Sequence, residues 1–245
     1  MQIAKYNASG NDFIIFHTFK KDNFSLFAKK LCHRQEGVGA DGLIVILPHS
    51  SFDFEWQFYN SDGSEANMCG NGSRAAAHYA YANKLTNSKL VFLTKAGTIR
   101  ANVEGEIVES ELTKPKLLKE KFTEEGREWY FYDTGVPHLV TRVNSLDEYS
   151  KELAKDMRYR YDANVNFVLY DKNSLYVRTY ERGVEDETGA CGTGMAACFY
   201  SLYLDGVVSE SIKVYPTSKE ELSLRIDSGN LFLKGRVRRV FETVV

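Results

Sequence analysis

Two short stretches of the chain have nearly the same sequence: Met-Cys-Gly-Asn-Gly at 68–72 and Ala-Cys-Gly-Thr-Gly at 190–194. Each is a Cys-Gly-x-Gly turn that opens an alanine-rich, nearly uncharged segment. The two cysteines, Cys69 and Cys191, lie about half of the 245-residue chain apart. This spacing predicts a duplicated unit that places one thiol at the start of a helix in each half.

Two predicted helices lack the polar face that a surface helix needs. In the helix predicted over Gly194–Leu204 there is no charged residue, so we expect it to be buried on all sides. The helix predicted over Arg74–Asn83 is rich in alanine, which lets surrounding strands approach closely. These features favour a curled sheet wrapped around one helix in each half. Two helices packed between ordinary sheets remain the alternative.

Short β-rich runs, bounded by glycine or charged turns, occupy much of the remaining chain. In the first half, strands are expected over Gly42–Leu47, Phe54–Tyr59, Lys89–Thr94, Thr98–Val103 and Glu106–Leu112. In the second half, they are expected over Trp129–Tyr132, His138–Val143, Val165–Tyr170, Ser174–Tyr180, Ile212–Tyr215, Glu221–Ile226 and Leu231–Val240. Two further helices are expected over Phe24–Cys32 and Leu146–Met157. The class is therefore α+β.

The charged stretch Thr113–Gly126 lies near the midpoint of the chain and is the expected domain boundary. The N-terminal domain then covers 1–113, and the C-terminal domain covers 114–235. The last strand, near 236–245, could return to the N-terminal domain. We predict two pseudo-symmetric domains, each a curled mixed or antiparallel sheet around a central helix, with one of the paired cysteines in each.

The composition is that of an ordinary globular protein, with 43% hydrophobic and 26% charged residues. A formal charge of −2 gives no general attraction to nucleic acid or to an anionic membrane. No apolar run approaches the ~20 residues of a membrane span, and no signal-peptide pattern opens the chain. The four cysteines show no CxxC spacing, which is typical of reduced thiols in the cytoplasm. We expect a cytoplasmic protein without nucleic-acid or membrane partners.

The repeated turn suits acid/base chemistry at sulfur. At a helix N-terminus, unpaired N–H groups and the helix dipole favour a thiolate and lower the pKa of a cysteine below its usual ~8.5. The same N–H groups can hold a carboxylate. Two such thiols could invert a carbon centre by removing a proton from one face and adding one to the other. Cys32 and Cys198 are expected to be buried hydrophobic residues. A disulfide between Cys69 and Cys191 remains an alternative. We would interpret it as an oxidised, inactive form.

Other chemistries fit the sequence less well. No His/Cys cluster has zinc spacing, so no metal site is expected. No Gly-x-Gly-x-x-Gly follows a strand and opens a helix, and the glycine-rich loop at 37–42 is followed by a predicted strand. Thiol-protease chemistry needs one cysteine and one base, which leaves the second Cys-Gly-x-Gly turn unexplained.

Taken in order, the motifs resemble those of diaminopimelate epimerase, a cofactor-independent amino-acid epimerase family. The resemblance runs nearly end to end. The matching segments are 9–13 (Ser-Gly-Asn-Asp-Phe), 37–42 (Gly-Val-Gly-Ala-Asp-Gly), 60–74 around Cys69, 135–138 (Gly-Val-Pro-His), 164–167 (Asn-Val-Asn-Phe), 181–183 (Glu-Arg-Gly) and 191–194. The resemblance implies the fold predicted above, a small-molecule substrate, no cofactor and a homodimer.

The resemblance also implies roles for individual residues. One α-carbon of L,L-diaminopimelate would lie between the sulfurs of Cys69 and Cys191, which would convert it to the meso isomer. The helix N-terminal N–H groups would hold the α-carboxylate; these belong to Gly70, Asn71, Gly192 and Thr193. His138 and Glu181 would set thiol protonation and bind the α-ammonium group.

The far end of diaminopimelate carries a second carboxylate and a second ammonium group. By resemblance, four residues would bind this end: Asn11, Asn60, Asn164 and Arg182. Each asparagine could instead be a turn residue, and Arg182 could instead form a surface salt bridge. His138, which follows a proline, could be a structural histidine.

The sequence departs from the common family pattern at three places. Val136 stands where many members carry an asparagine that contacts substrate, and Gly42 stands where some carry a glutamine. The segment 181–188 is one residue longer than usual. The departures bear on substrate choice, so a cofactor-independent racemase of another amino acid, such as proline or histidine, is the alternative. The paired cysteines oppose a phenazine-type isomerase and a binding protein that has lost the chemistry.

Overall fold

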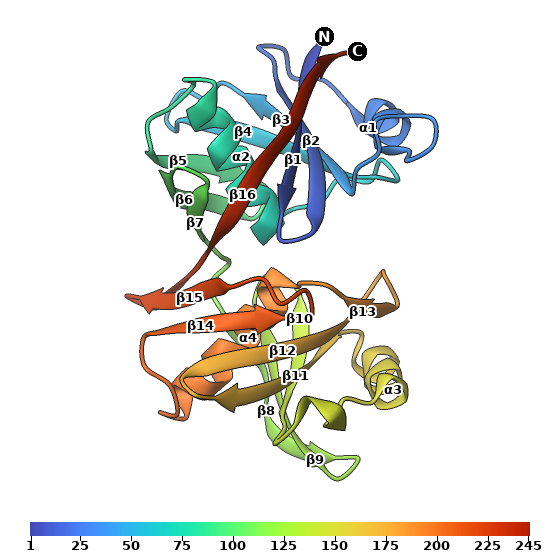
Figure 1. Cartoon of the computed structure of the whole chain (residues 1–245), viewed down its shortest axis with the longest axis vertical. Coiled ribbons are helices and arrows are strands. Elements are labelled where there is room, and N and C mark those ends of the chain that lie inside the picture. Colours follow the sequence, from blue (N-terminus) through green and yellow to red (C-terminus); the bar gives the residue numbers. More distant parts are fainter. The chain divides into compact units, whose positions relative to one another are not determined.

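The chain folds into two compact units, which are drawn in Figure 1. The computed structural model describes residues 1–245. Unit 1 consists of Met1–Glu111 and Gly235–Val245, and unit 2 consists of Leu112–Lys234. The long strand β16 (Asn230–Val244) contributes residues to both units.

Unit 1 is a curled sheet with a helix at its centre. Its strands follow one another in the sheet in chain order: β1 (Gln2–Ala8), β2 (Asn11–His17), β3 (Gly42–Leu47), β4 (Phe54–Asn60), β5 (Lys89–Thr94), β6 (Gly97–Glu104) and β7 (Ile107–Glu111). The sheet is mixed, because β2–β3 and β4–β5 are parallel and the other pairs within this run are antiparallel. Strand β16 pairs antiparallel with β1, from Gln2 opposite Val244 to Ala8 opposite Val237.

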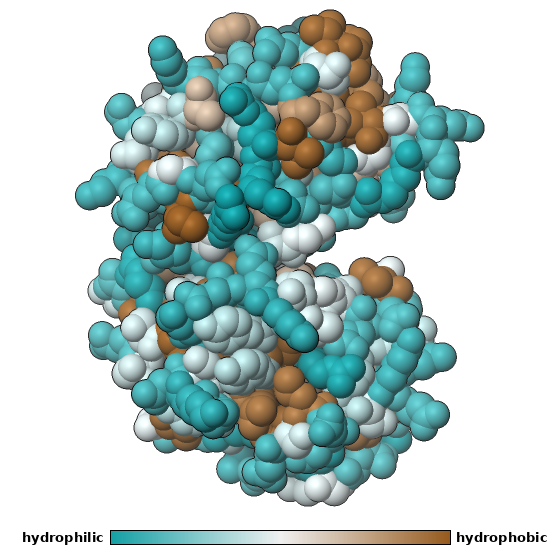
Figure 2. Space-filling view, in the orientation of Figure 1, coloured by the Kyte–Doolittle hydropathy of each residue, from teal (hydrophilic) through white to brown (hydrophobic).

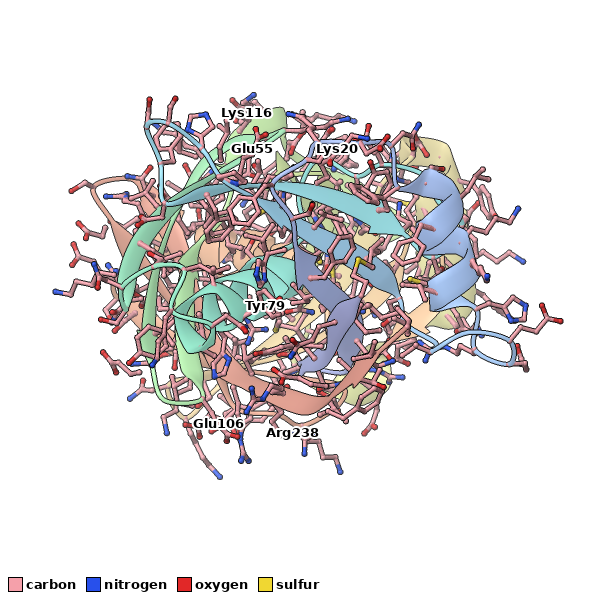
Figure 3. The ribbon with its side chains drawn as sticks, turned by 90° about the horizontal axis from the view of Figure 1, so that it is seen from above. Lys20, Glu55, Tyr79, Glu106, Lys116 and Arg238 are labelled. Carbon is pink, nitrogen blue, oxygen red and sulfur yellow. The ribbon has the colours of Figure 1, made fainter.

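Helix α2 (Gly70–Ala82) is the central helix of unit 1. It contacts β1, β2, β3, β6 and β7, and Ala75, Ala76 and Ala77 are fully buried. Figure 3 shows Tyr79 of this helix near the middle of the unit, with Glu55 and Glu106 at its rim. Helix α1 (Ser25–Cys32) packs against β3 and β4 and buries the residues of the opposite sheet face. Residues of β1–β4 therefore serve two separate cores, one on each face of the sheet.

Unit 2 has the same plan. Its sheet order is β16, β15 (Leu222–Asp227), β14 (Ser211–Pro216), β12 (Ser174–Glu181), β11 (Asn164–Asp171), β10 (Pro137–Arg142), β9 (Arg127–Asp133) and β8 (Lys116–Glu124), with β13 (Asp186–Thr188) beside β12. Helix α4 (Gly192–Leu204) is largely buried against β9, β10, β11, β12 and β14. Helix α3 (Lys151–Tyr161) packs against β11, β12 and β13. The α+β class and the curled sheet around a central helix are confirmed.

Three local expectations differ from the structure. Three strands, β1, β2 and β13, lie outside the strands expected from the sequence. The charged stretch Thr113–Gly126 contains the exposed strand β8. The helix expected over Leu146–Met157 is interrupted: a 3₁₀ turn (η1, Leu146–Glu148) comes first, and α3 begins only after its N-cap Ser150.

The outward side of β16 is basic over Arg236–Arg239. Arg236, Arg238 and Arg239 are exposed, and further along the strand Val240 and Phe241 are exposed as well. Figure 2 shows both hydrophilic and hydrophobic side chains on this face of unit 1. The neighbours of the arginines on the other side, Gly235 and Val237, are buried, as expected for a strand with one solvated face. None of the helices combines the length and the apolar character that a membrane span requires.

Candidate active site

In unit 1, Cys69 is the N-cap residue of α2. Its backbone is extended (φ −149°, ψ 118°), and its Sγ accepts a hydrogen bond from the Gly72 N–H at 3.3 Å. The sulfur therefore lies among the first N–H groups of α2, at the positive end of the helix dipole. This surrounding stabilises negative charge on sulfur.

A chain of amide groups runs beside Cys69. The Asn71 Nδ2 group donates to Asn11 Oδ1 at 2.6 Å, and Asn11 Nδ2 donates to Asp41 Oδ2 at 3.2 Å. On the other side, Arg74 Nη2 donates to Asn71 Oδ1 at 2.6 Å and to Ser9 Oγ at 2.8 Å. Unit 1 therefore brings together two of the predicted binding residues, Asn11 and Asn71, with both amides held in a defined orientation.

Asn60 is exposed at the end of β4 and serves a turn. Its Nδ2 group donates to Ser64 Oγ at 3.0 Å, and its main-chain N–H donates to Ser64 O at 2.8 Å. The next residue, Ser61, donates its N–H to Asp41 O at 3.0 Å, which connects this turn to the amide chain of Asn11. Asn60 therefore acts as a turn residue, which is the alternative considered from the sequence. It lies at the same end of the sheet as Asn11.

In unit 2, Cys191 is the N-cap residue of α4 and is only 7% exposed. Its Sγ lies 3.6 Å from Thr193 Oγ1, and Thr193 Oγ1 lies 2.9 Å from His138 Nε2. The side chain of His138 is thus connected to the sulfur through one hydroxyl group.

His138 is fully buried near the start of β10. Burial, helped by the positive charge of Arg182, lowers the pKa of its imidazole to about 3. The imidazole is therefore neutral at pH 7. Its second nitrogen, Nδ1, lies 3.1 Å from Asn166 Nδ2. Both ring nitrogens thus have protein partners.

The predicted binding residues of unit 2 gather at the same end of its sheet. Asn164 pairs with His138 in the β10–β11 register, and its Oδ1 accepts from the Arg182 N–H at 2.8 Å. The Arg182 guanidinium donates to Asp162 O at 2.9 Å and pairs with Asp162 Oδ2 at 3.0 Å. The salt bridge considered for Arg182 is therefore present. The carboxylate of Glu181, which ends β12, accepts from Thr188 Oγ1 at 2.7 Å.

Among the residues of these networks that the sequence did not single out as site residues are Asp41, Arg74 and Asn166. A usable signal existed for Asn166. Asn164 and Asn166 are two residues apart in an otherwise apolar strand, and this spacing puts both side chains on one face. Arg74 and Asn71 are three residues apart in one helix, but the contact of Arg74 with Ser9 and the contacts of Asp41 depend on tertiary structure and leave no local pattern.

The three departures from the family pattern can be located. A Cβ atom at Gly42 would lie 2.6 Å from the Phe58 ring and 2.8 Å from Tyr59 O, so this backbone has no room for a side chain there. Val136 is 36% exposed in the turn before β10. In the longer segment 181–188, residues 182–185 form the turn between β12 and β13.

The remaining two cysteines are unsuited to acid/base chemistry. Cys32 and Cys198 are both buried. Burial raises the pKa of Cys32 to about 12 and that of Cys198 well above the usual value. Of the four cysteines, only Cys69 and Cys191 occupy helix N-caps. No group of three or more histidine, cysteine or acidic side chains is close enough together to hold a metal ion.

The fold and the sequence both have relatives. A solved structure titled as a probable proline racemase from Agrobacterium radiobacter K84, with bound carbonate, superposes with a TM-score of 0.76 at 13% identity, covering 100% of this chain and 92% of that one. At this identity the likeness concerns the fold alone. Curated diaminopimelate epimerases from Nitratiruptor sp. and Campylobacter jejuni subsp. doylei are 60% and 53% identical, each over 99% of this chain and 98% of their own length.

The family profile described as diaminopimelate epimerase matches residues 3–118 and 130–240. The match includes both Cys-Gly-x-Gly turns and the residues that surround them in each unit. The chain therefore belongs to the diaminopimelate epimerase family of isomerases.

Proposed function

We propose that the protein converts L,L-diaminopimelate to its meso isomer without a cofactor, using the thiols of Cys69 and Cys191. The observation that carries this proposal is the near full-length identity to curated diaminopimelate epimerases. The placement of one cysteine at the N-cap of the buried central helix in each unit supports it. In the cell, the product would serve lysine and peptidoglycan-precursor synthesis.

In the proposed step, one sulfur acts as a thiolate and takes the α-proton of the substrate. The electron pair of the broken C–H bond stays on the α-carbon, and the second sulfur, a thiol, donates its proton to the opposite face. The stereocentre is inverted, and the two sulfurs have exchanged protonation states. The reverse reaction uses them in opposite roles. The mechanism requires both sulfurs to reach opposite faces of one carbon atom.

The α-proton of an amino acid is a very weak acid, so the carbanion needs stabilisation. The N–H groups of Gly70 and Asn71 at α2, and of Gly192 and Thr193 at α4, are suited to bind the α-carboxylate and the negative charge that develops on it. Such donors act most strongly where water is excluded. The carboxylate of Glu181 would hold the α-ammonium group, and His138, whose two ring nitrogens have protein partners, would help to set the thiol protonation states.

We assign recognition of the distal amino-acid group to Asn11, Asn60, Asn164 and Arg182. The guanidinium of Arg182 is suited to a carboxylate, although Asp162 holds one of its nitrogens in this structure. Substrate carboxylate would then compete with Asp162. Because Asp162 is largely exposed, with 75% of its side chain accessible, replacing this ion pair costs little.

Proton NMR in D₂O tests the proposal. Reduced protein free of pyridoxal phosphate should exchange the α-proton of L,L-diaminopimelate and produce the meso isomer. Variants Cys69→Ala and Cys191→Ala serve as matched controls. If L,L-diaminopimelate keeps its α-proton while L-proline or L-histidine exchanges, the protein is a racemase of the alternative class. A homodimer remains a prediction from the family resemblance, and a cytoplasmic location remains a prediction from the cysteine pattern; sedimentation analysis tests the first.

A further inference from the structure

A buried network behind Cys191 includes a residue to which the proposed reaction assigns no role. Asn166 lies in β11 and is fully buried. Its Nδ2 group lies 2.8 Å from Leu139 O and 3.1 Å from His138 Nδ1. Its Oδ1 accepts a hydrogen bond from Thr179 Oγ1 at 2.9 Å. All polar atoms of this side chain are therefore engaged.

The orientation of the Asn166 amide follows from its neighbours. The main-chain oxygen of Leu139 can only accept, so the atom of Asn166 that faces it must be the nitrogen. The hydroxyl of Thr179 then donates to the oxygen. A flipped amide would place two acceptor oxygens 2.8 Å apart, in a site without water contact.

The amide orientation decides which nitrogen of His138 carries the proton. Nδ1 faces the N–H of Asn166 and must accept, so a neutral imidazole carries its proton on Nε2. The Nε2–H then donates to Thr193 Oγ1 at 2.9 Å. Asn164 Nδ2 is a competing donor near Nε2, but it lies at 3.5 Å and has the Pro137 oxygen as an acceptor at 3.3 Å.

The Thr193 hydroxyl oxygen accepts the hydrogen bond from His138. Its own hydrogen is therefore available to donate to Cys191 Sγ, 3.6 Å away. We propose that Asn166 is a positioning residue that holds His138 in the Nε2–H form, so that Thr193 donates its hydrogen to the sulfur of Cys191. The order of donation is Asn166 to His138, His138 to Thr193, and Thr193 to Cys191. In this arrangement His138 stabilises the thiolate through Thr193 and does not take its proton.

The charged and ionisable groups near this network are few. Arg182 acts on His138 through its positive charge, which disfavours a second proton on the ring. Cys198, buried in the same helix as Cys191, has a raised pKa and stays neutral. The inference rests on the proposed function only in assuming that Cys191 acts as a thiolate. The direction of each hydrogen bond from Asn166 to Cys191 can be tested without substrate.

The first test is the tautomer of His138, read from ¹⁵N chemical shifts of the imidazole in uniformly labelled protein at pH 7. His138→Gln identifies the signal. We expect a proton on Nε2 only. In Asn166→Asp, the carboxylate should accept from Nδ1, so the proton should move to Nδ1. The control Asn173→Asp, at an exposed turn where the side chain accepts from Tyr170 OH, should leave the signal unchanged.

The second test measures the pH midpoint of Cys191 alkylation by iodoacetamide in a Cys69→Ser background. Thr193→Val removes the hydroxyl and should move the midpoint up by roughly 1–2 pH units, as expected for the loss of one hydrogen bond to a charged group. Thr193→Ser keeps the hydroxyl and should restore the original midpoint. This pair does not depend on whether Asn166→Asp folds.

Two results overturn the inference: a proton on Nδ1 in the unmodified protein, or equal midpoints for Thr193→Val and Thr193→Ser. Neither measurement uses diaminopimelate. A failure of α-proton exchange would therefore count against the proposed substrate and leave the hydrogen-bond order standing.

Discussion

The Oδ1 atom of Asn166 lies 2.3 Å from the position that a Cβ atom would take at Gly194. The helix residue that follows Thr193 thus has to be glycine for the buried amide to fit. The same position would be 3.2 Å from Thr179 Oγ1. The second glycine of this Cys-Gly-x-Gly turn is therefore explained by packing behind the site, in addition to any need for backbone approach to a ligand.

Replacing Gly194 by alanine should destabilise unit 2 and displace Asn166. Because the nearest atoms belong to a fully buried, fully bonded side chain, we expect a loss of about 1–3 kcal/mol in the free energy of unfolding, measured in urea. Gly189→Ala is the control, since its nearest neighbour would be Ser218 Cβ at an ordinary 3.8 Å. Equal stability of the two variants would show that the amide has room to move.

Removal of either paired thiol should abolish most of the activity. General acid/base groups contribute ~10²–10⁴-fold to rate, so Cys69→Ala and Cys191→Ala should each lower kcat/KM for diaminopimelate by at least about 100-fold. Cys198→Ala, in the same helix as Cys191, should retain activity within a few-fold. Turnover is followed by α-proton exchange. Substantial exchange in either single variant would contradict the two-thiol mechanism.

The stability of the protein should fall as pH drops below about 6.5, in part because of His138. The pKa of this histidine is about 3 in the folded protein and ~6.5 in the unfolded chain, so the unfolded state binds more protons between these values. The folded state therefore loses stability as the pH falls through this window. From pH 6.5 to 5, the contribution is roughly 1.5 kcal/mol.

Urea unfolding of His138→Gln at several pH values measures this contribution. The slope of stability against pH should be smaller in the variant than in the unmodified protein, whatever the absolute stability. His78 provides the comparison, because burial lowers its pKa too and His78→Gln should also reduce the slope. An unchanged slope in His138→Gln would mean that the imidazole is already protonated in the fold.

Val136→Asn should improve the binding of diaminopimelate. The position is 36% exposed in a turn, so the substitution should leave the melting temperature nearly unchanged. If the added amide reaches the substrate, as the family resemblance implies, one hydrogen bond should lower KM by about 2–10-fold with kcat unchanged. Steady-state kinetics measures both constants, and Val136→Thr is a matched control of similar size without an amide. A KM that stays constant in both would mean that substrate does not approach this turn.

The central helices were the most predictable part of the fold. The uncharged run after Gly194 could be stable only inside a sheet, and α4 is found there. Strand β1 could not be recognised because polar residues such as Lys5 interrupt its apolar pattern. Lys5 is tolerated at a buried position because it forms an ion pair with Asp12. Strand β8 shows no apolar alternation because most of its side chains are charged or exposed, as is common on strands at a sheet edge. The two units divide just before it, between Glu111 and Leu112.

The candidate site was predictable to the extent that its residues sit in local motifs. The N-cap positions of Cys69 and Cys191 follow from the glycine turns that open two apolar helices. The hydrogen-bond partners around the cysteines do not follow from local motifs. Asn166, for example, contacts His138 only because β10 pairs with β11. Arg74 likewise reaches Asn71 within its own helix, but its contact with the Arg236 oxygen requires the return of β16.

The pairing of β1 with β16 sets an order for folding on the ribosome. Every residue of unit 2 is synthesised before Gly235–Val245, the segment that unit 1 needs to complete its sheet. Unit 2 can therefore fold from one continuous segment of the chain. Unit 1 cannot complete its sheet until β16 has been synthesised, and until then the edge of β1 is unpaired. An open edge of this kind can recruit another strand, so the interval before β16 emerges is when this chain is most exposed to misassembly.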